Sequence, residues 1–421
     1  MRRNGLAIVL IILAAVVFAC GCTGTQTTSA TQQGDVQEIV VGVLLPLSGN
    51  YGEAGEASNA ALSVAADDLN DYYASIESDY RVRLVVEDTA TDPAVALDKL
   101  KALDAQGIQM VIGVGSSAEL EAIRAYADEH GILIVSTTSS AASLAIEGDN
   151  VFRFVPPDTR QADAMAYYLK EDDIAAVVPI FRGDVWGDEL RNLTAAAFEV
   201  RNGTVLDGVR YTPDQEDYTA LVADLDLQVG RAIAAHGKEK VGVYAVTFNE
   251  IMPIMTAAAG TGNLTEVRWY GSDGNVLKTF ASHGDAARFA VQTNYTGPTF
   301  GETALEPRSE AIYQTIQDRI GRQPDGYSMA SYDALWVLAL IGLQTDSTDI
   351  NALKAAYMET ATSYSRALAG PVQPDAAGDP STAHYCFWSV EADGDAYRWV
   401  PVAQYDLWTA GEPPEFEVIG A

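Results

Sequence analysis

Hydrophobic and polar positions are arranged in blocks of two different periods from residue 38 onward. The stretch "EIVVGVLLPL" (residues 38–47) is almost continuously apolar, which is typical of a strand buried on both faces of a parallel sheet. The next block, "GEASNAALSVAADDLN" (residues 55–70), places its apolar residues at helical spacing. The two blocks together predict one strand–helix unit.

The same order of blocks continues to residue 156. "RVRLVVEDTA" (residues 81–90) predicts a second strand, and "DPAVALDKLKALDAQG" predicts a helix with Asp92 as its N-cap, Pro93 at its first position and Gly107 at its end. A helix at 116–131 then lies between predicted strands at 108–115 and 132–137, and "VFRFVP" (151–156) follows. An alternating series of this kind predicts a doubly wound α/β lobe with a parallel sheet.

A second alternating series begins after Pro156 and Pro157. Its predicted helices cover residues 160–171, 186–203, 217–225 and 250–262, and its predicted strand segments cover 173–181, 204–211, 240–247 and 267–272. We therefore expect two doubly wound parallel-sheet lobes. Ligands of such sheets bind beyond the carboxyl ends of the strands, so the mouth between the lobes is the expected site. The tail after Pro380 is rich in Trp and Tyr, which indicates strands, but the pattern does not indicate which sheet they join.

The N-terminal segment has the composition of an export signal. Arg2 and Arg3 precede an uncharged apolar run at residues 6–19, which is too short to span a bilayer comfortably. "ACGCTG" then places Cys22 as in a lipoprotein box, so we expect residues 1–21 to be removed and Cys22 to carry a lipid; an ordinary signal with two incidental cysteines is the alternative. Residues 22–37 are too polar to offset the cost of ordering and are expected to form a flexible tether.

Charge and cysteine content narrow the classes of function. The formal charge of −32 becomes −34 if residues 1–21, which hold Arg2 and Arg3 and no acid, are removed. Nucleic acid is excluded as a partner, because phosphate binding needs a basic surface. After processing at Cys22, Cys386 is the other remaining thiol, so stability has to come from the hydrophobic core.

Catalytic chemistry is not indicated by any motif in the sequence. The four histidines form no metal-spaced pair and lie beside no recognised nucleophile, and "GVGSS" lacks the lysine of a phosphate-binding loop. We therefore expect a protein that is not an enzyme and that has neither cofactor nor metal. The histidines are His130, His236, His283 and His384.

Five segments, in the same order, resemble the leucine/isoleucine/valine-binding proteins, the type I periplasmic binding proteins that serve ABC amino-acid importers. They are "VGVLLPLSGNYGEAGE", "GVGSSAELEAIRAYADEHGILIVSTTSS", "FRFVPPDTRQADAMAYYL", "VWGDELRNLTAAAFEVRNGTVLDGVRYTPDQEDYTALVADL" and "WYGSDG". The resemblance implies a monomeric, membrane-anchored binding protein that closes on an amino acid, by default a branched-chain one, and docks on a permease. An extracellular sensor of the same fold, or a binder of an amide or another small polar solute, is the alternative.

The resemblance also implies three crossings of the chain between the lobes, near Pro156, Thr293 and Gly370. The first lobe would then hold residues 38–156 and 293–370, and the second lobe residues 157–292 and 371–421.

An amino acid needs hydrogen-bond donors for its carboxylate and an acid for its ammonium group. Backbone N–H groups of "GVGSS" at a helix start form an anion site. Ser117 matches the family serine that contacts the ligand carboxylate, with a simple N-cap as the alternative. Ser140 stands where the family usually has threonine, and Thr138 matches a position that often gives a backbone contact.

The second half of the expected site is Asp273, which matches the family acid that pairs with the ligand ammonium; an ordinary Ser-Asp-Gly turn is the alternative. Tyr51, Trp186 and Phe248 match aromatic positions that are often tyrosine in the family, with ordinary packing as the alternative. The departures at Trp186 and Phe248 leave an aromatic ligand or an amide open beside the branched-chain default.

Overall fold

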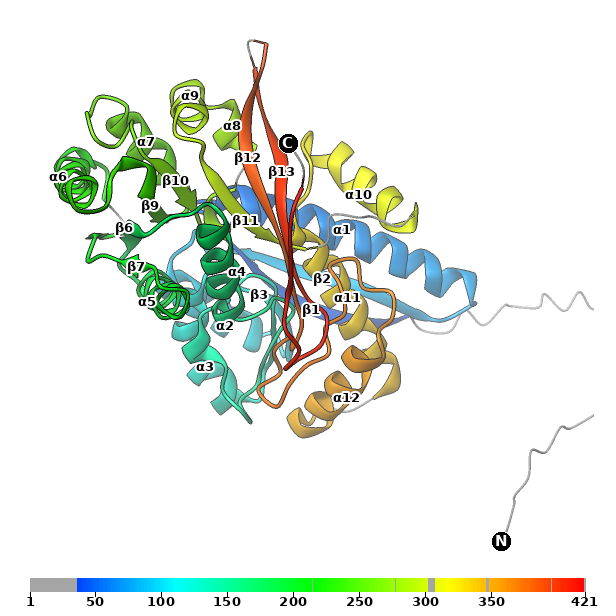
Figure 1. Ribbon diagram of the computed structural model, residues 1–421. Coiled ribbons are helices and arrows are strands. Elements are labelled where there is room, and N and C mark those ends of the chain that lie inside the picture. The colour runs from blue at the N-terminus through cyan, green and yellow to red at the C-terminus, as the bar shows by residue number, and fades with distance from the viewer. Residues whose placement is uncertain are drawn as a thin grey trace, which may run out of the picture. The chain divides into compact units, whose positions relative to one another are not determined.

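The computed structural model describes residues 36–419, except residues 214, 277, 302–306, 346–347 and 395 (Figure 1). From Val36 onward the chain forms one compact unit. The expected export signal, the lipid-attachment residue Cys22 and most of the expected tether lie outside the described residues.

The first sheet has five strands in the order β2-β1-β3-β4-β5, and every neighbouring pair is parallel. Its strands are those predicted from the apolar runs, and β4 is buried along its whole length. The sheet thus has the doubly wound arrangement expected for the first lobe. The strands are β1 (Gln37–Leu45), β2 (Tyr80–Asp88), β3 (Met110–Gly113), β4 (Leu133–Ser136) and β5 (Val151–Arg153).

Helices from two distant parts of the chain pack around this sheet. The early ones are the predicted crossover helices, and the later ones follow the second sheet in sequence; α1 packs against both α10 and α11. By length and composition α11 could cross a membrane, but most of it is buried inside the protein, as in a core helix. The helices are α1 (Gly52–Ser75), α2 (Pro93–Asp104), α3 (Ser117–His130), η1 (Ala142–Leu144), α10 (Pro307–Ile320), α11 (Gly326–Gln344) and α12 (Ile350–Ser363).

The second sheet is mixed. Its order is β14-β13-β12-β11-β10-β9-β6-β7, with β8 also pairing with β6; β6 to β11 are parallel, and β12 to β14 are antiparallel. The strands are β6 (Ala176–Arg182), β7 (Thr204–Val205), β8 (Val209–Tyr211), β9 (Val241–Val246), β10 (Arg268–Gly271), β11 (Thr296–Phe300), β12 (Ala383–Asp393), β13 (Ala396–Leu407) and β14 (Glu415–Val418). The helical segments of this half are α4 (Asp158–Glu171), α5 (Val185–Val200), α6 (Thr219–His236), η2 (Lys238–Lys240), α7 (Ile251–Ala258), η3 (Asp273–Asn275), α8 (Lys278–Ser282) and α9 (Gly284–Gln292).

Two crossings differ from their expected places. β11 lies after Thr293 but pairs with β10 and β12, so the chain leaves the second sheet after Phe300, because the parallel sheet takes one more strand before the chain turns back. Near the third crossing, the Arg153 N–H of β5 still donates to the Gly378 carbonyl (3.0 Å), beyond the expected Gly370. The aromatic tail then forms the long β12–β13 hairpin (Figure 1).

Candidate functional site

One cavity collects all seven residues expected to contact a ligand, and Gly115, Ser116 and Gly274 complete its lining. Four of the seven follow strands of the first sheet and three follow strands of the second, at the carboxyl ends where such sheets bind ligands. The cavity volume is about 10 Å³, room for about one water molecule, so the lobes are closed on each other. The seven are Tyr51, Ser117, Thr138, Ser140, Trp186, Phe248 and Asp273.

The first wall of the cavity is the start of α3. Ser116 is its N-cap, and the Ser116 hydroxyl accepts a hydrogen bond from the Glu119 N–H (3.3 Å), so Ser117 is the first helical residue rather than the cap. The Ser117 hydroxyl accepts hydrogen bonds from the Ala141 N–H (3.2 Å) and the Ser139 hydroxyl (2.9 Å). First-turn N–H groups without an intrahelical partner, next to a positive helix end, suit a carboxylate.

The loop after β4 carries the next two predicted residues. The Thr138 hydroxyl donates to the Val114 carbonyl, so what Thr138 can offer a ligand is its backbone. The Ser140 carbonyl accepts a hydrogen bond from the Asp158 N–H (2.8 Å), which joins this loop to the start of α4. Arg153 contacts the same loop, since its guanidinium donates a hydrogen bond to the Ala141 carbonyl (2.8 Å). The guanidinium also forms a buried ion pair with Asp379.

Asp273 faces the cavity from the second sheet, in the turn after β10. Its side chain is buried; one carboxylate oxygen accepts from the Tyr327 hydroxyl, and the other, Oδ1, has no hydrogen-bond partner among the described residues. Its N–H donates to the Gln161 side chain (3.0 Å). Burial raises the pKa of Asp273, and hydrogen bonds with Tyr327 and Gln161 offset part of that rise. A buried carboxylate with a free oxygen suits a cation, because an unpaired buried charge is costly.

A second buried acid, Asp158, lies beside Asp273 and was not singled out from the sequence. Its Oδ1 accepts a hydrogen bond from the Gln161 amide (3.2 Å), and Oδ2 has no partner among the described residues. Burial raises the pKa of Asp158, and the negative charge of Asp273 raises it further. Gln161 therefore joins the two acids. Asp158 occurs in the quoted segment "FRFVPPDTRQADAMAYYL", but an acid at a helix start is common and gave no signal of its own.

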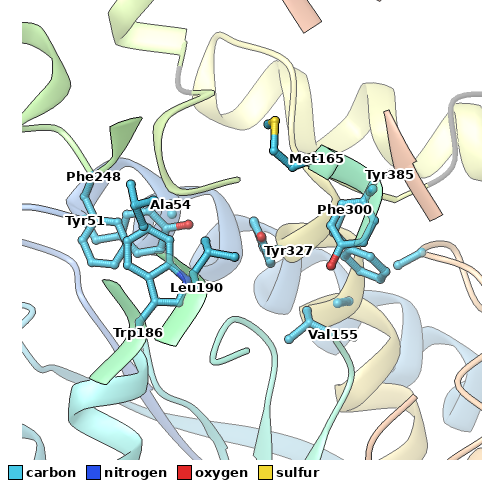
Figure 2. Close-up of a cluster of buried hydrophobic side chains, with 14 of the residues drawn as sticks. Tyr51, Ala54, Val155, Met165, Trp186, Leu190, Phe248, Phe300, Tyr327 and Tyr385 are labelled. Atoms are coloured by element: carbon cyan, nitrogen blue, oxygen red, sulfur yellow. The ribbon is translucent and has the colours of Figure 1, made fainter. Parts of the chain in front are cut away.

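Three stacked aromatic rings form the remaining wall (Figure 2). The Phe248 ring centre lies 4.5 Å from that of Tyr51 and 4.7 Å from that of Trp186. The Arg182 guanidinium lies 4.3 Å from the Phe248 ring centre and pairs with Glu250. Because Tyr51 belongs to the first lobe and the other two rings to the second, the stack crosses the mouth between the lobes.

Sequence reasoning also missed Tyr327, the second residue of α11. Figure 2 shows it between the aromatic stack and the ring pair Phe300 and Tyr385. Its only local signal is an N-cap pattern at Asp325, and that pattern does not reveal that the hydroxyl reaches Asp273. Within the described part of the chain, no group of three or more His, Cys, Asp or Glu side chains is placed to hold a metal ion.

The family model described as "Periplasmic binding protein" matches residues 38–396. The chain belongs to the periplasmic binding protein family. This confirms the resemblance seen in the sequence, and family membership implies a solute-binding protein located outside the cytoplasm.

Individual proteins and solved structures are similar to this chain. An uncharacterized protein of Methanocaldococcus jannaschii is 28% identical over 416 residues, 94% of this chain and 97% of that protein. A "Leu/Ile/Val-binding protein homolog 3" of Brucella melitensis is 27% identical over 190 residues, which cover 45% of this chain and 51% of that protein. The crystal structure of the leucine-binding protein LivK from Thermotoga maritima superposes with a TM-score of 0.70 at 20% identity, covering 86% of this chain and 97% of that one. The expected two-lobed α/β fold is confirmed.

Proposed function

We propose that this periplasmic binding protein is the solute-binding component of an ABC importer and that it captures an α-amino acid, or a similar small zwitterion, between its closing lobes. The observation that carries the proposal is the pair of complementary groups on one cavity. Asp273 offers an unpartnered buried carboxylate oxygen, and the start of α3 offers donors at a positive helix end.

Each predicted residue takes a role in this proposal. The ligand ammonium pairs with Asp273, and its carboxylate binds at Ser117 and the first-turn N–H groups of α3. The Ser140 hydroxyl and the Thr138 backbone add polar contacts, and the aromatic stack covers the side chain. Catalysis has no part in this scheme. Ligand binding and closure of the lobes are sufficient, because closure changes the surface that the permease recognises.

The same proposal includes the N-terminal segment. We infer that Cys22 carries the lipid after removal of residues 1–21, that the binding unit is monomeric, and that an ABC permease receives the closed form. The tether to the outer face of the membrane then covers residues 22–36 rather than 22–37, because Gln37 already pairs with Tyr80 in β1. The lobe assignment is part of the proposal too, with the second crossing placed after Phe300 and the third beyond Gly378.

A ligand that is only anionic, or a neutral sugar, fits this site less well. The buried carboxylate of Asp273 repels an anion that brings no cationic group, and a neutral solute leaves its free oxygen uncompensated. A sensor that reports the same ligand to a separate partner shares this site chemistry, so it differs from the importer in the partner alone.

Replacement of Asp273 tests the proposed ammonium contact. Because removal of one member of a buried charge pair costs 2–5 kcal/mol, we expect Asp273→Asn to weaken amino-acid binding by at least about 30-fold while the fold is kept. Titration calorimetry gives the affinity, and a panel of amino acids, amides, short peptides and sugars in a thermal-shift screen gives the ligand class. Asp285→Asn makes the same chemical change at an exposed ion pair and should leave the affinity unchanged. An equal affinity in wild type and Asp273→Asn would refute the contact.

A further inference from the structure

We propose that Trp186 and Phe248 restrict the site to α-amino acids with a very small side chain, glycine or alanine, and exclude the branched aliphatic ones. This inference rests on the proposed function and narrows its substrate class. It departs from the branched-chain default, and it arises from the packing of the closed cavity.

The first step is the space that closure leaves. The cavity lined by both the Ser117 and the Asp273 subsites has a volume of only about 10 Å³, room for about one water molecule. The ammonium, carboxylate and α-carbon of an amino acid already need more than this, which a slight opening of the lobes can supply. Further side-chain carbons need space that the rings of Tyr51, Trp186 and Phe248 fill in the closed cavity.

The second step is that the Phe248 ring is held from several directions. Tyr51 and Trp186 stack on it, and the Arg182 guanidinium lies against it. The Phe248 N–H donates to the Glu250 carboxylate (2.8 Å), and Glu250 itself pairs with Arg182. Moving the ring therefore disturbs a buried ion pair as well as two aromatic contacts, which makes the wall stiff.

The third step is that the indole reaches the turn that carries Asp273. A Cβ atom built on Gly274 would lie 2.9 Å from Trp186 Cη2 and 2.6 Å from Phe248 Cδ1, so both rings touch the backbone next to Asp273. Trp186 itself is buried, with 4% of its surface exposed. The far edge of the indole thus occupies the space into which a side chain would extend from an α-carbon held beside Asp273.

The size of the expected discrimination follows from the cost of methylene groups in a filled pocket. One methylene more or less changes binding by roughly 10–200-fold. We therefore expect the protein to bind alanine at least about tenfold more tightly than leucine. A smaller ring at position 186 removes the far edge of the indole. The preference for alanine over leucine should then shrink or reverse.

Titration calorimetry on the wild-type chain with glycine, alanine, valine, leucine and isoleucine tests the restriction directly. Trp186→Tyr and Trp186→Ala then test the assignment to this side chain, and we expect the leucine-to-alanine affinity ratio to rise at least about tenfold in both. Trp336→Tyr is the matched control, because Trp336 packs on Tyr72 and Tyr332 of the first lobe, away from the cavity. It should leave the ratio unchanged.

The possible outcomes separate this inference from the function on which it rests. Binding of leucine or isoleucine by the wild type as tightly as alanine would overturn the size restriction and leave the proposed function intact. A wild type that prefers alanine, with an unchanged ratio in a folded Trp186→Tyr, would overturn the role of Trp186. Failure of every amino acid to bind would overturn the proposed function and the inference together.

Discussion

A single buried acid at the start of α3 shows how one residue can set a pH response. Glu119 is buried in the first turn of α3, and its carboxylate accepts a hydrogen bond from the Ser116 hydroxyl (2.7 Å). Burial raises the pKa of Glu119 to about 7, although the Thr89 and Ser116 hydroxyls beside it offset part of the rise. The folded protein therefore holds a proton here that the unfolded chain releases at lower pH.

We expect Glu119→Gln to flatten the dependence of stability on pH. Because the folded-state pKa is above the unfolded value, the proton stabilises the fold below about pH 4.5, and this contribution is lost as the pH rises through about 7. Between pH 5 and pH 8 the wild type should lose about 2 to 3 kcal/mol more free energy of unfolding than Glu119→Gln. Urea unfolding at both pH values measures this difference.

Glu121→Gln is the control for this experiment, because Glu121 is an exposed acid of the same helix. Its loss of stability between the two pH values should equal that of the wild type. If the Glu119→Gln protein behaves in the same way as the wild type, Glu119 is ionised in the fold despite its burial.

At the scale of the element, the local sequence predicted the start of helix α2 correctly. The pattern predicted Asp92 as an N-cap and Pro93 at the first position, and the Asp92 carboxylate accepts hydrogen bonds from the Ala94 N–H (2.8 Å) and the Val95 N–H (3.0 Å). The helix ends at Asp104, earlier than predicted, and Gly107 has a left-handed φ of 76° in the turn that follows. These contacts join residues that are close in the chain.

Removal of the α2 cap should therefore lower the stability of the fold through this one local contact. Asp92→Ala leaves two first-turn N–H groups without their acceptor and should lower the free energy of unfolding by about 1 kcal/mol, as measured from the urea midpoint. Asp98→Ala in the same helix is the control, since Asp98 is exposed and its ion pair with Lys101 is long (3.9 Å). Equal stability of Asp92→Ala and the wild type would mean that water replaces the cap without loss.

Contacts between the lobes define the state of the whole molecule. Asn50 of the first lobe donates to the Pro213 carbonyl (3.2 Å) and to the Glu250 carboxylate (3.3 Å) of the second. The Glu53 carboxylate accepts from the Thr279 N–H (3.1 Å). Together with the stack of Tyr51 on Phe248, these contacts favour the closed form, and a ligand has to add only the remaining bias.

Weakening one of these contacts should shift the population of the empty protein toward an open form. Asn50→Ala removes two interlobe hydrogen bonds, each contributing about 0.5–1.5 kcal/mol, so ligand affinity should fall by about tenfold. Small-angle X-ray scattering should show a larger radius of gyration without ligand and the wild-type value at saturation. Asn192→Ala, at an exposed position of α5, should change neither quantity. An unchanged radius and affinity in Asn50→Ala would show that this contact does not hold the lobes.

The sequence by itself determined the strands of the first sheet, the helices α1 to α3 between them, the Asp92 cap and the alternation that makes the lobes α/β, because these depend on neighbours in the chain; the helices α10, α11 and α12 were not predicted. It placed Ser117 and Asp273 as members of one site through ordered resemblance, and the structure brings them to one cavity. The fold alone decided the strand order, the place of β11 in the second sheet and the antiparallel strands of the tail, since strand pairing joins residues far apart. It also decided that Tyr327 and Asp158 complete the surroundings of Asp273, because a hydrogen bond between side chains 54 positions apart and an electrostatic interaction between acids 115 positions apart leave no periodic trace in the chain.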